Sequence, residues 1–410
     1  MTVRLSDYDR AILDGEEGEG PALAMRVLMG TAQAMGAAAL LDIVGAHVDG
    51  CLYEGQAGLD FALRLVAGGA RAKVPTTLNV TSIDLLHPQL VRPPHPAEAR
   101  ALVDAYVELG CSPTWTCAPY QIPESAGLAR PCLGDQVAWA ESNAIVFANS
   151  VLGARTERYG DFLDICAAVT GRAPAAGLHL DQGRLAGFVL SVEPIASRLG
   201  DDYVYPLLGL VLGEVALGRV GAIVGLPPDT DEDRLKAIGA AAATSGSVAM
   251  FHAVAITPEA PDLDTATGGR AVEVLEVQEQ DLERARRSLT TTAGGRVDAV
   301  CLGTPHYSLA QMSALARRVE GRKCVRPLYV NTGRHTLAAM SDEERGSLVE
   351  TGVTVVTDTC TYLVPVLAPG VRTVMTDSAK WAYYAPANLG VDVVYASQEE
   401  CVLFATGGGG

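Results

Sequence analysis

Lysine is scarce in this chain. Of its 410 residues only four are lysines, Lys73, Lys236, Lys323 and Lys380. Asp and Glu together number 48, against 31 Lys and Arg, which gives a formal net charge of -17. Such a field repels phosphate backbones and anionic lipid surfaces. We therefore expect no nucleic-acid partner and no membrane partner, and a lysine such as Lys380 stands out as a candidate functional group.

Long apolar runs are also missing. The most apolar windows, around residues 22–44 and 204–217, are interrupted by Arg26 or Glu214 and by glycines, and the second is too short to cross a bilayer. The first residues are acidic, where a secretory signal peptide needs a basic start and an apolar core. With 49% hydrophobic residues, the chain is able to bury a large interior. We therefore expect a folded cytoplasmic protein.

Several common catalytic motifs are absent. The sequence contains neither the phosphate-loop pattern GxxxxGKS/T nor a GxGxxG between a strand and a helix, and it has no GxSxG nucleophile elbow. Its nine cysteines include no closely spaced pair of the kind that zinc sites use, and their odd number argues against a disulfide framework. A nucleotide-dependent α/β enzyme is thus disfavoured but stays open as an alternative.

Helix and strand patterns alternate along the chain. Residues 39–48, ALLDIVGAHV, are typical of a buried strand, and the alternation after residue 201 continues to VDVVYAS at residues 391–397. This order predicts an α/β fold with doubly wound, mostly parallel sheets. We place approximate boundaries between an N-terminal α/β region (1–200), a middle α/β region (201–290) and a C-terminal doubly wound lobe (291–410).

Several cysteines and polar residues fall on loops that follow predicted strands. Cys117 in TWTCAPY, Cys301 in VCLGTPH and Cys360 in VTDTCTYL are such cysteines. Loops at the carboxyl ends of parallel strands converge on one edge, which is the geometry that an iron-sulfur cluster needs, whereas simple burial of the thiols is the alternative. An Arg, a Lys and several hydroxyls together suit an anionic substrate. The polar candidates are His47, Thr76, Thr77, Glu141, Asn149, Arg155, His179, His306, Ser378 and Lys380.

Seven stretches of the chain are long or unusual enough to suggest a family. They are TCAPY, AWAESNAIVFANSVLGARTER, TGRAPAAGLH, FHAVAITPEA, GTPH, TDTC and TDSAKWAYYAP. In these stretches the chain resembles the large (catalytic) subunit of the aconitase X family of hydro-lyases, and the resemblance covers nearly the whole sequence. It implies an aconitase-like, multi-lobed architecture and the dehydration of a hydroxy acid with an iron-sulfur cluster. Two activities are known in this family, cis-3-hydroxy-L-proline dehydratase and mevalonate 5-phosphate dehydratase.

By this resemblance, Cys117 and Cys360 look like cluster ligands. Many family members carry GCPH where this chain has GTPH, so Thr304 stands at the position of the usual third cysteine. Cys301 lies three residues earlier, and the period of two along a strand turns it to the opposite face from Thr304. The third ligand is therefore Cys301 after a local bend, another cysteine, or none. The cluster type, 2Fe-2S, 3Fe-4S or 4Fe-4S, stays open.

The resemblance also implies a partner. Family members are a fused chain or a large subunit with a separate small swivelling domain, and this sequence resembles the large part. We therefore expect a small swivelling-domain subunit that supplies a catalytic serine. Within this chain we expect the catalytic residues to be Lys380, Ser378, His47, His179 and His306, and the substrate-binding residues to be Thr76, Thr77, Glu141, Asn149 and Arg155.

The expected substrate is a small anionic hydroxy acid. A phosphorylated substrate favours a dense basic pocket, and this chain offers few lysines near the candidate loops. An amino acid needs one cationic clamp and an acidic partner, such as Glu141 or Asp49, for its ammonium group. We therefore expect conversion of cis-3-hydroxy-L-proline to 1-pyrroline-2-carboxylate, with mevalonate 5-phosphate as the alternative substrate. A cluster-free binding or regulatory paralogue is the alternative of a different class.

Overall fold

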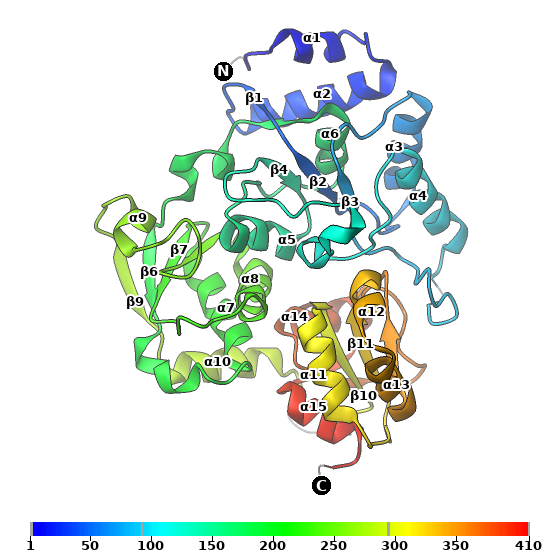
Figure 1. Ribbon diagram of the computed structural model, residues 1–410, viewed down its shortest axis with the longest axis vertical. Coiled ribbons are helices and arrows are strands. Elements are labelled where there is room, and N and C mark those ends of the chain that lie inside the picture. The colour runs from blue at the N-terminus through cyan, green and yellow to red at the C-terminus, as the bar shows by residue number, and fades with distance from the viewer. Residues whose placement is uncertain (1–2, 92, 293–295, 409–410) are drawn as a thin grey trace.

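The computed structural model describes residues 3–91, 93–292 and 296–408. These residues form three regions, each containing a parallel β-sheet, which follow one another from blue to red in Figure 1. The mixed α/β fold with several parallel sheets confirms the predicted fold class. Among the helices described, none combines the length and the apolar character that a membrane span requires.

The N-terminal region contains a three-stranded parallel sheet in the order β3-β2-β4 and an antiparallel pair, β1 and β5. Its strands are β1 (Leu40–Asp42), β2 (Gly45–Val48), β3 (Thr76–Leu78), β4 (Val137–Trp139) and β5 (Arg172–Pro174). Its helices are α1 (Asp7–Leu13), α2 (Glu19–Ala34), α3 (Gln56–Ala67), α4 (Pro96–Glu108), α5 (Ser142–Phe147) and α6 (Leu163–Thr170).

Residues 39–48, predicted as one buried strand, form the separate strands β1 and β2 in two different sheets. The chain changes partners between them, because the amide of Ile43 donates to Gly171 and the amide of Val44 donates to Gln136. Val44 is 54% exposed, so the apolar run is not continuously buried. The second strand still ends at His47 and Val48, which places the following Asp49 at the carboxyl edge of the sheet.

The middle region has a four-stranded parallel sheet in the order β8-β7-β6-β9. Its strands are β6 (Phe188–Ser191), β7 (Gly221–Val224), β8 (Phe251–Ala253) and β9 (Glu273–Glu276), and its helices are α7 (Val204–Ala216), α8 (Glu232–Gly246), α9 (Leu263–Thr267) and α10 (Glu279–Leu289). β6 precedes residue 201 and pairs with both β7 and β9. The approximate boundaries at residues 200 and 290 stay a prediction.

The C-terminal region has a five-stranded parallel sheet in the order β12-β11-β10-β13-β14. Its strands are β10 (Ala299–Tyr307), β11 (Leu328–Thr332), β12 (Val353–Val356), β13 (Thr373–Thr376) and β14 (Asp392–Tyr395), and its helices are α11 (Leu309–Val319), α12 (Arg334–Ala339), α13 (Asp342–Thr351), α14 (Ala379–Leu389) and α15 (Gln398–Ala405). β10 comes first in the chain and lies at the centre, so the strand order reverses beside it. In such sheets ligands bind at the carboxyl ends of the strands at this point.

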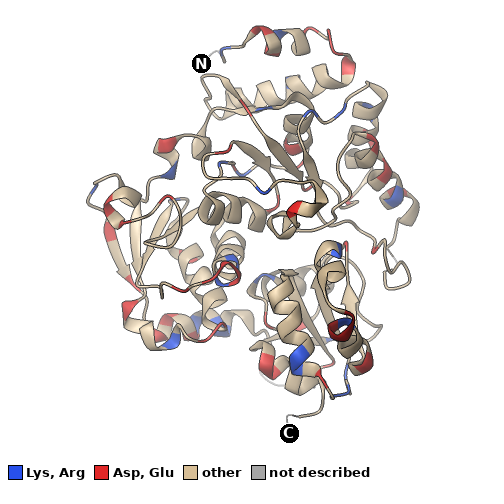
Figure 2. Cartoon of the chain, in the orientation of Figure 1, with Lys and Arg blue, Asp and Glu red and all other residues tan. Residues whose placement is uncertain are grey.

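The apolar cores hold the regions together. One core joins the middle and C-terminal regions and includes Phe188, Leu208, Ile238 and Trp381. The N-terminal region has a core of its own around Met25. Acidic and basic residues occur on elements of all three regions, so the net charge is spread over the molecule (Figure 2).

All nine residues of β10 are buried, although the strand ends in the polar sequence TPHY. Its register with β11 shifts between Leu302 and Tyr307. At Gly303, where φ is +83°, an added Cβ would lie 2.2 Å from the carbonyl oxygen of Asn331. Only glycine fits this close approach, which bends the strand just before Thr304 and His306.

Replacing Gly303 with Ala is expected to destabilise the fold more than replacing Gly321 with Ala. Both glycines have positive φ, +83° and +71°, but a Cβ at Gly321 meets nothing within 4 Å. The left-handed conformation alone costs about 1 to 2 kcal/mol, and overpacking against Asn331 should add about 1 to 3 kcal/mol at Gly303 only. Chemical denaturation of both variants measures the difference, and equal losses would contradict the close approach.

Candidate functional site

Three donor side chains from distant parts of the chain meet near the carboxyl edge of the C-terminal sheet. Cys117 precedes the short turn Pro119–Gln121, His306 lies near the end of β10, and Cys360 follows β12. The two sulfur atoms and a ring nitrogen of His306 all lie within 4.8 Å of one another, and all three side chains are buried. Two thiols and an imidazole at this spacing are a donor set for a transition metal. We refer to these residues as the Cys-His-Cys group.

The His306 side chain is fixed on both sides of its ring. Its Nε2 lies 3.3 Å from the carbonyl oxygen of Thr359, which only accepts, and its Nδ1 lies 3.0 Å from the hydroxyl oxygen of Thr116. Burial lowers the pKa of His306 to about 4, so the ring is neutral at pH 7. The neutral ring therefore donates through Nε2 and keeps a lone pair on Nδ1.

The two thiols of the group are closely coupled. The hydrogen bond with Cys117 and burial raise the pKa of Cys360 well above its usual range. The backbone amide of His306 donates to Cys117 Sγ at 3.3 Å. Two buried thiols side by side disfavour ionisation, whereas a bound cation reverses this preference. The donor chemistry thus fits a metal centre.

Cys301 is not part of the Cys-His-Cys group. It is buried within β10, where it pairs with Tyr329 of β11 and Thr376 of β13, and burial raises the pKa of its thiol. Thr304 lies on the wall of a cavity together with Cys117 and Cys360. Its hydroxyl oxygen is buried and has no hydrogen-bond partner among the described residues, so it is available to a bound group.

A cavity of about 350 Å³, which we call the small cavity, lies beside the Cys-His-Cys group. Asp49, Asn79 and Glu141 reach it from just beyond the carboxyl ends of β2, β3 and β4, and Thr304 and Lys380 reach it from the C-terminal region. The carboxyl edges of two sheets thus face one chamber of the size that small-molecule sites have. The remaining lining residues are Leu52, Val80, Cys117, Ser142, Ile145, Arg158, Tyr159, Cys360, Tyr362, Leu363, Tyr384 and Asn388.

A buried ion pair crosses this cavity wall. Lys380 Nζ contacts Glu141 Oε1 and donates to Ser142 Oγ at 3.3 Å, and the side chains of Lys380 and Glu141 are only 5% and 6% exposed. Burial by itself lowers the pKa of Lys380, but Glu141 together with Tyr362 and Cys117 outweighs it, so the pKa lies well above its usual range. The second oxygen of Glu141 accepts from the amide of Ala144 at 2.8 Å and caps α5. Lys380 therefore stays a fixed cation.

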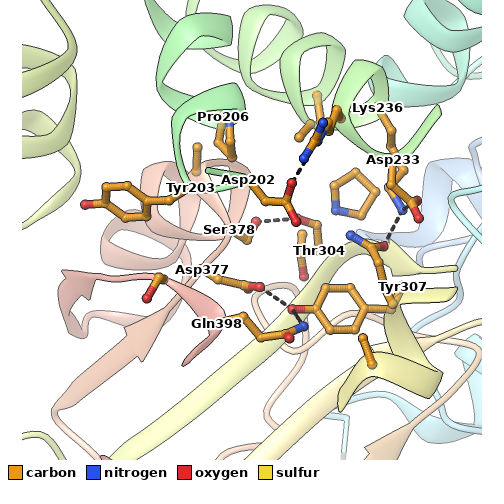
Figure 3. Close-up of a pocket in the computed structure, with 18 of the residues that line it drawn as sticks. Asp202, Tyr203, Pro206, Asp233, Lys236, Thr304, Tyr307, Asp377, Ser378 and Gln398 are labelled. Atoms are coloured by element: carbon orange, nitrogen blue, oxygen red, sulfur yellow. Dashed lines mark hydrogen bonds and ion pairs between the residues drawn. The ribbon is translucent and has the colours of Figure 1, made fainter. Parts of the chain in front are cut away.

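A second, larger cavity of about 640 Å³ shares Thr304 and Lys380 with the small cavity. Figure 3 shows it between Lys236 and Asp233 of α8 and Tyr307, Asp377 and Ser378 of the C-terminal region. Lys236 Nζ donates to Asp233 at 2.7 Å, to Gln311 at 2.6 Å and to the carbonyl oxygen of His306 at 3.4 Å. The middle region thereby touches the main chain of the Cys-His-Cys group.

Ser378 lies at the start of α14, two residues before Lys380. Its hydroxyl accepts from the amide of Trp381 at 3.0 Å and donates to the carbonyl oxygen of Thr304. It lines the large cavity but not the small one. The structure thus gives Ser378 a capping function and a contact with the bend that presents Thr304.

Three predicted residues lie within the N-terminal sheet. His47 Nδ1 lies 2.8 Å from Thr77 Oγ1, and Thr76 Oγ1 donates to the carbonyl oxygen of Val74 at 2.8 Å. Burial lowers the pKa of His47 to about 3, so its ring is neutral. None of the three lines either cavity described above. Their predicted catalytic or binding functions stay predictions.

Three further predicted residues lie away from the small cavity. The side-chain amide of Asn149 donates to Thr156 and Ala249, Arg155 forms an ion pair with Asp181 at 2.6 Å, and His179 contacts Gln136 and Tyr159. Burial lowers the pKa of His179 to about 4. That these three residues contact the substrate directly therefore also stays a prediction.

Sequence reasoning missed several residues that face the small cavity. Arg158 follows Arg155 by three residues within GARTERYG and lines the cavity, and so do Tyr159, Tyr362 and Tyr384. Charge and residue type did not distinguish Arg155 from Arg158. Only the chain path after β4 decides which of the two faces the cavity.

Comparisons with known proteins define the class. Three protein-family models match the chain. They are described as "Aconitase X first domain", "Aconitase X second domain" and "Aconitase X third domain", and they match residues 2–182, 188–287 and 297–407. A crystal structure of Thermococcus kodakaraensis aconitase X in its holo-form superposes with a TM-score of 0.86, at 30% sequence identity and with 98% of this chain and 99% of that chain covered. The chain belongs to the aconitase X family.

Relatives with assigned activities are dehydratases, and this chain is an enzyme of that hydro-lyase type. It is 45% identical to cis-3-hydroxy-L-proline dehydratase of Pseudomonas aeruginosa, over 99% of this chain and 70% of the relative. It is 40% identical to the enzyme of the same name from Hypocrea jecorina, over 100% of this chain and 69% of the relative. It is 36% identical to the phosphomevalonate dehydratase large subunit of Methanothermobacter thermautotrophicus, over 96% of both chains.

Replacing Lys380 with Met should destabilise the protein by about 3 to 5 kcal/mol, because the Glu141 charge is then buried without a partner. The double variant Lys380→Met/Glu141→Gln should recover most of this loss, since neither charge remains. Arg100→Met serves as control, because its ion pair with Asp104 has side chains that are both 61% exposed and should contribute less than about 1 kcal/mol. Urea denaturation measures all three, and a double variant as unstable as Lys380→Met would refute the argument.

Replacing His47 with Gln should weaken the acid sensitivity of folding. The pKa of His47 is lowered to about 3 in the fold, so the unfolded chain binds more protons below its ordinary pKa of 6.5. Stability is therefore lost as the pH falls through 6.5, and His47 should account for about 1 kcal/mol of the loss between pH 7.5 and 5.5. His95→Gln, at an exposed position, is the control. Denaturation at the two pH values checks the difference, and an unchanged slope in His47→Gln would contradict it.

Proposed function

We propose that this chain is the large catalytic part of an iron-sulfur hydro-lyase that converts cis-3-hydroxy-L-proline to 1-pyrroline-2-carboxylate. The observation that carries the proposal is the Cys-His-Cys group beside a small cavity that holds one buried lysine-carboxylate pair. The 45% identity to a dehydratase of this substrate supports the choice. A group of polar and charged residues without thiols would not suggest this chemistry.

The metal centre is assigned to the residues that meet. Cys117 and Cys360 supply two thiolates, and His306, or the unpaired hydroxyl of Thr304 on the same cavity wall, is the candidate for a third donor. Cys301, expected as a third ligand after a bend, is instead held within β10 by its pairing on both sides. An iron-sulfur cluster bound here supplies a Lewis acid for the carboxylate and the leaving hydroxyl of the substrate.

The chain's own residues orient the substrate and hold its charges. Lys380 remains protonated beside Glu141 and lies on the cavity wall, where it attracts a carboxylate without moving. The tyrosine and leucine side chains of the lining lower the local dielectric constant, which strengthens this attraction. Removal of the proton next to the carboxylate needs a positioned base, which contributes typically about 10²- to 10⁴-fold.

That base is assigned to a partner. The archaeal relatives are named as large subunits, and one of them matches this chain over 96% of both sequences. We assign the catalytic serine to a small swivelling-domain polypeptide that closes over the small cavity. Because all nine cysteines are free thiols and two of them are metal donors, the reducing cytoplasm is the compartment that suits the enzyme.

A second candidate substrate is mevalonate 5-phosphate. The match to the phosphomevalonate dehydratase large subunit over 96% of both chains favours it. Against it, the basic residues Lys380 and Arg158 of the small cavity are matched by the acidic residues Glu141 and Asp49. A doubly charged phosphate prefers several unpaired cations, so we rank this substrate second.

Replacing Cys117 or Cys360 with Ala should remove the iron and abolish dehydration, because each variant deletes one of two buried thiolates. The enzyme is purified anaerobically together with the small partner, and its iron and sulfide content, visible absorption and turnover of both substrates are measured. Cys132→Ala removes an exposed thiol and should retain the iron. Wild-type iron content in Cys117→Ala and Cys360→Ala would refute the ligand assignment, and turnover of mevalonate 5-phosphate alone would refute the substrate.

A further inference from the structure

Two polar side chains lie next to each other on one wall of the small cavity. Val48 of β2 pairs with Leu78 of β3, so the following residues, Asp49 and Asn79, leave the sheet side by side. The side-chain amide of Asn79 donates through Nδ2 to Asp49 Oδ1, and both residues line the cavity. The contact fixes the amide with its nitrogen toward the carboxylate and its oxygen on the other side.

The amide oxygen of Asn79 is an acceptor without a donor. The residue is only 3% exposed, and its Oδ1 is buried and has no hydrogen-bond partner within the part of the chain that the structure describes. A buried acceptor left unpaired is unfavourable, because it has lost its hydrogen bond to water. A ligand that donates a hydrogen bond at this point would remove that cost.

Within the described ranges of the chain, the carboxyl group of Asp49 forms no ion pair with a lysine or arginine. Burial and the nearby carboxylates of Glu141 and Asp161 raise its pKa to about 8. Asp164 accepts from the amide of Asp49 at 2.6 Å, so it positions the loop but adds no positive charge. Lys380 is already bound to Glu141. At pH 7 this carboxyl group is therefore mostly protonated when no cation lies beside it, and a ligand cation would favour its ionised form.

We propose that Asp49 and Asn79 form the subsite for the ring ammonium group of a cyclic amino-acid substrate. A protonated secondary amine carries two N–H donors and one positive charge, which match the carboxylate of Asp49 and the free amide oxygen of Asn79. A phosphate or a second carboxylate offers only acceptors and negative charge there. The inference rests on the proposed function, because that function places an organic acid in the small cavity, and it narrows the substrate to a zwitterion.

Arg158 complements this subsite on the same cavity. Its guanidinium has no ion pair among the residues that the structure describes, while the carboxylate of neighbouring Glu157 accepts from the backbone amides of Arg158 and Leu178. Among the described residues, Asp49 and Arg158 are thus an acidic and a basic group on the cavity wall without an ion pair, which suits the opposite charges of a zwitterion.

Two ring acids that differ in a single position test the subsite. L-Proline carries the ring ammonium, and tetrahydrofuran-2-carboxylate has an ether oxygen in its place. Binding of each probe is measured on the full chain, purified anaerobically with its small partner, by competition and by calorimetry. The wild-type protein should prefer L-proline by at least about 10-fold, because a charge-assisted hydrogen bond contributes about 1.5 to 3 kcal/mol.

Asp49→Asn and Asn79→Leu should each reduce this preference to less than about 3-fold, with the affinity for the ether unchanged or improved. Asp104→Asn, which changes a carboxylate that is 61% exposed and lines neither cavity, should keep the wild-type preference. The two variants are made separately, so that a failure to fold in one leaves the other to decide. Folding is checked by the thermal transition.

Equal affinity of the wild-type protein for both probes, or an undiminished preference in either folded variant, would overturn the subsite. The proposed function is tested by a different measurement, turnover of cis-3-hydroxy-L-proline. If the wild-type enzyme dehydrates this substrate and the variants keep the preference for L-proline, only the subsite fails. If it does not dehydrate the substrate, the proposed function fails whatever the probes show.

Discussion

The ion pair between Lys380 and Glu141 joins the last region of the chain to the first at the point where the candidate chemistry takes place. Glu141 also caps α5 through its second oxygen, so the carboxylate is held from two directions. Separating the partners would leave a buried charge without compensation, which costs several kcal/mol. Cys117 belongs to the first region and Cys360 to the last. The same pair therefore helps to keep the two thiols at a fixed distance.

The buried lysines of the protein are paired with carboxylates. Both Lys236 and Lys380 are buried, and each is bound to at least one carboxylate. Positive charge in the interior is thus largely neutralised by the protein itself. The small cavity is polar without being basic, and its selectivity depends on where individual donors and acceptors point. Net charge, which is dominated by the surface, gives no guide to this selectivity.

The sequence was sufficient to predict the class of fold, because strand and helix periodicities alternate strongly from residue 201 onward. It also indicated Cys117 and Cys360, since both lie in loops after predicted elements and in family-like motifs. It did not predict that His306 would complete the group. That position depends on the bend at Gly303, where the main chain of Asn331 leaves no room for a side chain. Contacts between elements so far apart in sequence leave no local signal.

The residues that line the small cavity were harder to predict than the two cysteines of the Cys-His-Cys group, for a related reason. Arg155 and Arg158 are chemically identical and three residues apart, yet Arg155 is bound to Asp181 while Arg158 lines the small cavity. Asn79 was not among the site residues predicted from the sequence. Its free amide oxygen becomes apparent when the contact with Asp49 is known. Periodicity assigns residues to elements, but the direction of a loop side chain depends on tertiary contacts.

Lys236 of the middle region donates a hydrogen bond to the main chain of His306. The middle region thereby contacts the Cys-His-Cys group, although the three donor side chains of the group come from the other two regions. Because Lys236 is anchored on α8, any displacement of that helix pulls on the imidazole's own backbone. Mutations on the surface of α8 are therefore capable of altering the geometry of the Cys-His-Cys group from a distance, and the middle region supports this group as well as lining the large cavity.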